Sequence, residues 1–137
     1  MNTHKITAIA SMIMISLTWI SCASDKQTSD DMAVEQVDNE TFQKLITEGN
    51  GILLDVRTEE EITNGVILEP KKIDFSSADF SEQLDRLPKD SEIYVYCAVG
   101  GRSGKTAELL KEKGFKKIYN LRGGYEEWKK EGYPVNE

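Results

Sequence analysis

The stretch Ile93-Tyr94-Val95-Tyr96-Cys97-Ala98-Val99-Gly100-Gly101-Arg102-Ser103 carries the strongest structural signal in this 137-residue chain. Its first four residues form an apolar run that predicts a short buried strand, and residues 103–113 have the apolar spacing of an amphipathic helix. A cysteine therefore stands where a strand turns into a helix. Two adjacent glycines let the loop curl with its amide N–H groups inward, and the helix adds the positive end of its dipole. We expect an anion cradle that favours the thiolate of Cys97 at its mouth.

Strand-like and helix-like segments alternate on both sides of this loop. Strands are expected at 52–56, around 73, at 93–96 and at 117–120, and helices at 39–48, 59–64, 80–87, 103–113 and 125–131. Asp38 can cap the first helix, and Thr58 with Glu61 forms a capping box for the second. The alternation predicts one α/β domain over residues 34–137, with a small, mainly parallel sheet and helices on both faces. Ligands of such sheets bind at the carboxyl ends of strands, where Cys97 falls.

The N-terminal segment has the organisation of a secretory signal. Residues 1–21 combine a short basic start, an apolar run and small residues near the end. The run is shorter than the roughly 20 residues that span a bilayer and contains hydroxyl residues, which disfavours a transmembrane anchor. The stretch Leu17-Thr18-Trp19-Ile20-Ser21-Cys22 resembles a bacterial lipobox, which implies that Cys22 is the lipid-modified first residue of the mature chain; the alternative is an ordinary cleaved signal.

The polar residues that follow predict a flexible tether over 22–33. Lipid chains on Cys22 would hold such a protein on a membrane. We therefore expect a lipid-anchored protein on the periplasmic side of the bacterial cell envelope.

Charge and cysteine content restrict the chemistry. Without residues 1–21 the chain carries 16 basic and 24 acidic side chains, a net charge of -8, which disfavours nucleic acid as a partner. If Cys22 is acylated, Cys97 is the remaining thiol, so we expect no internal disulfide, no cysteine-based metal site and no cofactor. The one histidine, His4, lies in the signal. Cys97 must therefore be activated by backbone dipoles and arginine.

Four short motifs occur in order between residues 34 and 135. They are Leu54-Asp55-Val56-Arg57, Glu60-Glu61-Ile62-Thr63-Asn64-Gly65, Cys97-x-x-Gly100-x-Arg102-Ser103, and Asn120-Leu121-x-Gly123-Gly124-x-x-x-Trp128. In this order and spacing they resemble the rhodanese-like family of single-domain sulfurtransferases. The resemblance implies that family's α/β fold.

The resemblance also implies a persulfide mechanism. The Cys97 thiolate would take the outer sulfur of a donor such as thiosulfate and pass it to cyanide or a thiol acceptor. The residues expected to bind the substrate and the persulfide are Ala98, Val99, Gly100, Gly101, Arg102 and Ser103, mainly through their amides. Arg102 is expected either to orient the loop and add positive charge near the sulfur or to pair with a buried carboxylate. Asp55 and Arg57 are expected to be structural supports.

Two features separate this chain from the family pattern. Val66 stands where the family commonly has a histidine, and Ala98 and Val99 bring no basic or hydrogen-bonding side chain into the loop.

The loop is one residue shorter than that of the related phosphatases and arsenate reductases, which disfavours those activities. The main alternative to a sulfurtransferase is a lipid-tethered module that carries persulfide sulfur to a protein partner, or only binds one, with little turnover.

Overall fold

The structure, a computed structural model, describes residues 33–137 and contains a five-stranded sheet in the order β1-β5-β4-β2-β3. The strands are β1 (Ala33–Val37), β2 (Ile52–Asp55), β3 (Lys71–Lys72), β4 (Ile93–Tyr96) and β5 (Lys117–Leu121). The helices are α1 (Asn39–Glu48), α2 (Glu59–Ile62), α3 (Phe80–Asp85), α4 (Gly101–Glu112) and α5 (Gly124–Lys130). Every pair of neighbouring strands is parallel, so the predicted α/β class with a parallel sheet is confirmed.

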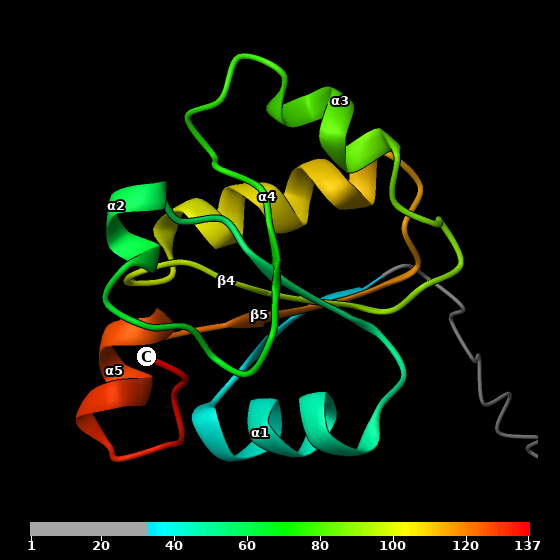
Figure 1. The fold of residues 1–137 in the computed structure, drawn as a ribbon. Helices are drawn as coiled ribbons and strands as arrows, with labels where there is room; N and C mark the ends of the chain where they lie inside the picture. The colour runs from blue at the N-terminus through cyan, green and yellow to red at the C-terminus, as the bar shows by residue number, and fades with distance from the viewer. Residues whose placement is uncertain (1–32) are drawn as a thin grey trace, which may run out of the picture.

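Helices cover both faces of the sheet, as the alternating sequence predicts. Figure 1 shows α3 and α4 on one face and α1 and α5 on the other. In β4, Ile93 and Val95 pack into the core beneath α3 and α4, whereas Tyr94 and Tyr96 pack towards α1 and α5. Both faces of β4 are therefore buried, which explains why its sequence is a continuous apolar run.

The local helix signals are confirmed. The Asp38 carboxylate accepts a hydrogen bond from the Thr41 amide at 2.9 Å and caps α1. The Thr58–Glu61 capping box is formed at the start of α2. The boundaries differ in places, because α2 ends at Ile62 and α4 already begins at Gly101. Within residues 33–137 no helix combines the length and apolar character needed to cross a bilayer.

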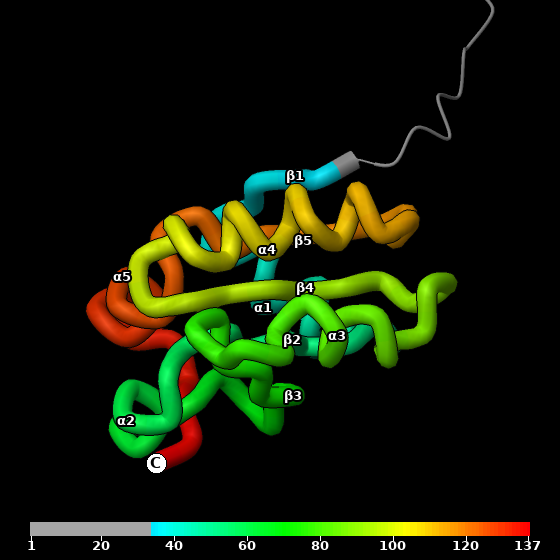
Figure 2. Tube along the Cα trace, turned by 90° about the horizontal axis from the view of Figure 1, so that it is seen from above, coloured from blue at the N-terminus to red at the C-terminus, as the bar shows by residue number. Residues whose placement is uncertain are grey.

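The sheet contains one strand that was not predicted, and Figure 2 shows its place at one edge. β1 pairs with β5 along its whole length, from Ala33 opposite Lys117 to Val37 opposite Leu121. Ala33, expected to end the tether, is thus the first residue of this strand. The predicted signal, the predicted lipid site at Cys22 and the remainder of the predicted tether lie outside the described residues. At the other edge, β3 is only two residues long and precedes Ile73.

The segment around Val66 is held by the end of the chain. The Val66 amide donates to the Asn136 carbonyl and the Asn136 amide donates to the Val66 carbonyl, both at 2.8 Å. The side-chain amide of Asn136 also donates to the carbonyl of Leu68, which has a left-handed φ of 49°. Backbone pairing therefore fixes this turn where the family commonly has a histidine.

Candidate active site

The loop that carries Cys97 lies at the carboxyl edge of the sheet, between β4 and α4. Cys97 directly follows β4, and Gly100 is the N-cap of α4 with a left-handed φ of 89°. A β-carbon at Gly100 would collide with the Arg122 carbonyl oxygen. Glycine is therefore required at this turn both by its conformation and by the close approach of a neighbouring segment.

The Cys97 sulfur accepts hydrogen bonds from its own loop and from the first turn of α4. The Gly100 amide nitrogen lies 3.2 Å from Sγ, and the Ser103 hydroxyl lies 3.4 Å from it. Burial by itself would raise the pKa of Cys97, but the Ser103 hydroxyl and the amides of Ser103, Val99 and Gly100 outweigh it, so the pKa is lowered. The predicted cradle thus favours the thiolate, as the sequence suggests.

The prediction that the thiol lies at the mouth of the cradle is wrong. Cys97 is only 1% exposed and belongs to the hydrophobic core beneath α4. The cause is that β4 is buried on both faces up to its last residue, so the side chain after it enters the same layer. Burial alone would also suit an inert core cysteine. The donors directed at the sulfur distinguish Cys97 from such a residue.

The first turn of α5 holds the loop from outside. The Tyr125 amide donates to the Cys97 carbonyl at 2.8 Å, and the Glu126 amide donates to the Ala98 carbonyl at 3.0 Å. Because the carbonyl and N–H of a trans peptide point in opposite directions, carbonyls directed at α5 leave the loop amides directed away from it. A β-carbon at Gly124, where φ is 64°, would lie 2.5 Å from the Ala98 oxygen. The Gly123-Gly124 motif therefore shapes the cysteine loop.

Arg102 pairs with a glutamate from α2. Its two terminal nitrogens donate to the two carboxylate oxygens of Glu61 at 2.8 and 2.5 Å. This pairing lowers the pKa of Glu61 from 4.5 to about 2. The Glu61 carboxylate raises the pKa of Arg102, and the negative charge of the Cys97 thiolate raises it further. Arg102 is thus paired with a carboxylate, as one of the two expectations has it, but this carboxylate is 34% exposed rather than buried.

Asp55 and Arg57 form a second pair, fully enclosed beneath the site. The Arg57 guanidinium donates to Asp55 at 2.7 Å and to the Gly65 carbonyl at 2.8 Å. It also lies 3.9 Å from the centre of the Tyr125 ring. Burial would lower the pKa of Arg57, but Asp55 raises it. The pair joins the end of β2 to α5, which is the geometry of a structural support.

Some residues of the site have no clear sequence signal. The capping box identifies Glu61, but nothing in the sequence connects it with Arg102, 41 positions away. Tyr125 and Glu126 act through their amides, which carry no side-chain signature. Lys105, one turn into α4, is exposed. Residues 33–137 contain no group of three or more His, Cys, Asp or Glu side chains that could hold a metal ion.

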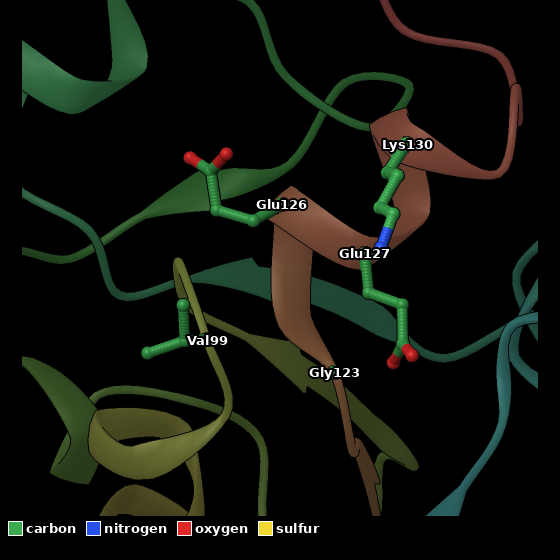
Figure 3. A pocket seen from close by; sticks show the side chains of 5 residues that line it. All are labelled: Val99, Gly123, Glu126, Glu127 and Lys130. Atoms are coloured by element: carbon green, nitrogen blue, oxygen red, sulfur yellow. The ribbon is translucent and has the colours of Figure 1, made fainter.

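An open pocket lies beside the loop, between its tip and α5. Its lining residues, which Figure 3 shows, are Val99, Gly123, Glu126, Glu127 and Lys130. Val99 is 69% exposed. Cys97 is thus buried and Ala98 and Gly100 are half-buried, whereas the Val99 side chain at the loop tip is presented to solvent.

Comparison with known proteins agrees with this geometry. The model of the rhodanese family, described as a rhodanese-like domain, matches residues 38–131. A sulfurtransferase of Allochromatium vinosum is 30% identical over 103 residues, which cover 74% of this chain and 94% of that protein. The thiosulfate sulfurtransferase GlpE of Coxiella burnetii is 33% identical over 103 residues, covering 72% and 90%.

Solved structures show the same fold. A rhodanese-related protein from Thermoplasma volcanium superposes with a TM-score of 0.66 at 29% identity, covering 74% of this chain and 97% of that one. A rhodanese-like domain protein from Staphylococcus aureus gives a TM-score of 0.64 at 28% identity, covering 76% of this chain and 100% of that one.

Proposed function

The chain belongs to the rhodanese-like family, and on that premise we propose that it is a sulfurtransferase in which Cys97 carries sulfur as a persulfide. The observation that carries the proposal is the set of donors on the Cys97 sulfur, from Gly100 and Ser103. They lower the pKa of the thiol despite its burial, and the thiolate is the nucleophilic form.

The loading step needs no metal and no external base. The Cys97 thiolate attacks the outer sulfur of thiosulfate and forms an S–S bond to it. The S–S bond of thiosulfate breaks, and its electron pair leaves with sulfite. The persulfide anion that remains on Cys97 carries the charge that the thiolate had, so donors already directed at this position stabilise it.

Thiosulfate is the first donor to test because relatives such as GlpE of Coxiella burnetii carry it in their names. In the unloading step the persulfide anion takes a proton from water, and cyanide or a thiolate then attacks the outer sulfur. The S–S bond of the persulfide breaks, its electron pair stays on Cys97 as the thiolate, and the acceptor keeps the sulfur with its proton, which thiocyanic acid returns to water. The lowered pKa of Cys97 makes its thiolate a better leaving group than an ordinary thiolate.

Intact mass of the purified protein before and after thiosulfate tests the proposal. We expect a gain of one sulfur, about 32 Da, that reductant removes and that is absent from Cys97→Ser. Release of thiocyanate on addition of cyanide would complete the cycle. A protein that gains no sulfur from thiosulfate or from a polysulfide, or a Cys97→Ser variant that still turns over, would contradict the mechanism.

We also propose that the protein is held on the periplasmic side of the cell envelope by lipid on Cys22. The support is the signal-like organisation of residues 1–21 and the lipobox-like stretch that ends at Cys22. Fractionation of cells that produce the wild type and Cys22→Ala tests this. We expect the wild type in the membrane fraction and Cys22→Ala released from it, and equal membrane partitioning of the two would overturn the proposal.

A further inference from the structure

Resting on this sulfur-transfer function, we propose that the pocket beside the Cys97 loop, called the acceptor groove, binds a lysine- or arginine-bearing segment of a protein whose cysteine receives the sulfur. The groove is lined by Val99 of the loop and by Gly123, Glu126, Glu127 and Lys130 at α5. Its occupant is a basic protein segment and not a free small thiol.

The acceptor groove is directly joined to the reacting loop. The same residue, Glu126, supplies an amide that binds the Ala98 carbonyl and a side chain that lines the groove. Figure 3 shows the Val99 side chain on the cysteine loop and, above it in this view, the Glu126 side chain on α5. A segment bound in the groove would therefore contact loop residues that are one or two positions from Cys97 in the chain. A cysteine of that segment could then approach the outer sulfur of the persulfide.

The charges around the loop favour a cation. Glu126 and Glu127 are exposed, and neither forms an ion pair within residues 33–137. On the other side of the loop, where Arg102 binds α2, the first turn of that helix adds exposed Glu59 and Glu60. Lys130 is the single cation among the residues that line the groove.

The arginine of the loop does not reverse this balance. Both carboxylate oxygens of Glu61 bind Arg102, so its charge is already compensated. Ala98 and Val99 add no charge of their own. Lys or Arg side chains next to a cysteine are therefore attracted to the glutamates at the rim of the site.

Val99 supplies the apolar part of this surface. At 69% it is the more exposed of the two large hydrophobic residues that are exposed within residues 33–137, the other being Leu68 at 37%. Protein-binding sites combine an apolar centre with a polar rim, and Val99 can supply the apolar contact here. A low-molecular-weight thiol is too small to contact Val99 and both glutamates together. A peptide segment spans them.

The transfer step on this surface balances in atoms and charge. The acceptor cysteine thiolate attacks the outer sulfur of the Cys97 persulfide and forms a new S–S bond. The S–S bond within the persulfide breaks, and its electron pair returns to Cys97 as a thiolate. The acceptor cysteine keeps the outer sulfur and its proton as a new persulfide.

Binding and transfer are measured separately, so that docking and sulfur chemistry can fail independently. For binding, three dye-labelled peptides differ only in flanking a central serine with two lysines, two glutamines or two glutamates. We expect the lysine peptide to bind about tenfold more tightly than the glutamate peptide at low salt, and the difference to shrink at high salt. The same peptides with cysteine in place of serine are then given to the sulfur-loaded protein.

Variants test whether the acceptor groove is responsible. In Glu126→Gln/Glu127→Gln, and separately in Val99→Ser, the transfer rate to the lysine peptide divided by the rate to 2-mercaptoethanol should fall about threefold to tenfold. Glu108→Gln/Glu112→Gln removes the same charge from exposed positions of α4 and should leave that ratio unchanged.

Equal binding of the lysine and glutamate peptides overturns the docking proposal, even if Cys97 loads with sulfur. The docking proposal is also overturned if the Glu126→Gln/Glu127→Gln protein keeps the full preference for the lysine peptide. Failure of Cys97 to load overturns the sulfur-transfer function instead, and charge-selective binding of the serine peptides still decides whether the groove docks a basic segment.

Discussion

Two arginines lie close to the candidate site, and each is paired with a carboxylate in a different environment. Arg57 is 2% exposed, binds a completely buried Asp55 and lies over the ring of Tyr125. Arg102 is 29% exposed and binds Glu61, which is 34% exposed. The first pair joins segments of the core, and the second joins the reacting loop to α2. The comparison indicates that burial determines whether an arginine pair supports the fold or tunes the loop.

Removal of the buried arginine is the strongest test of this comparison. Arg57→Ala leaves Asp55 as an uncompensated buried charge, so we expect the free energy of unfolding to fall by about 3–5 kcal/mol. Urea denaturation followed by circular dichroism measures it. Arg86→Ala, which breaks an exposed pair with Glu82, is the control and should cost less than about 0.5 kcal/mol. Equal costs for the two variants would refute the assignment of Arg57 as a structural support.

Removal of the exposed arginine should affect transfer more than folding. In Arg102→Ala the loop loses its attachment to Glu61 and the thiolate loses a nearby cation. We expect the sulfur-transfer rate to fall about 10-fold to 100-fold, while the free energy of unfolding changes by no more than about 1 kcal/mol. Arg102→Lys should recover part of the rate, since it retains the charge but not the two-point contact. A stability loss as large as that of Arg57→Ala would remove the distinction.

Acid should break the exposed pair within a defined pH window. The pKa of Glu61 is lowered from 4.5 to about 2, so the pair contributes fully above pH 4.5 and is lost as the pH falls towards 2. Glu61→Gln keeps a capping side chain but cannot form the ion pair. The difference in unfolding free energy between wild type and Glu61→Gln should stay constant, at no more than about 1 kcal/mol, from pH 8 to pH 5 and then shrink. A difference that grows below pH 4 would contradict this sign.

The smallest expected change concerns the thiol itself. Ser103→Ala removes a hydroxyl that binds the Cys97 sulfur at 3.4 Å. The pKa of Cys97 should rise by at most about one unit, because one hydrogen bond contributes about 0.5–1.5 kcal/mol. Thiolate absorbance near the ultraviolet limit measures the titration without requiring a reagent to reach the buried sulfur. Ser103→Thr, which keeps the hydroxyl, should titrate like the wild type, and an unchanged pKa in Ser103→Ala would remove Ser103 from the cradle.

Local signals in the sequence were sufficient for most elements of the fold. Asp38, the Thr58–Glu61 capping box and the apolar run Ile93–Tyr96 each act over a few residues, and each is found where expected. β1 was missed because it pairs with β5, more than 80 positions away, and its own five residues alternate too briefly to be recognised.

The candidate site divides in the same way. The order of Cys97, Gly100, Arg102 and Ser103 predicts the cradle, because those residues act on one another within a single turn. The partner of Arg102 and the burial of the sulfur depend on how α2 and α4 pack on the sheet. Such contacts join residues that are distant in sequence, so composition and spacing do not reveal them.

The way the cysteine loop is held has a consequence for how such a protein diversifies. Main-chain groups of Tyr125 and Glu126 and the close approach of Gly124 fix the loop, so its shape does not depend on the side chains at positions 98 and 99. Substitutions at these two positions can therefore change substrate preference while the nucleophile stays in place. Specificity can thus evolve through these two side chains without disturbing the cysteine chemistry on which every variant depends.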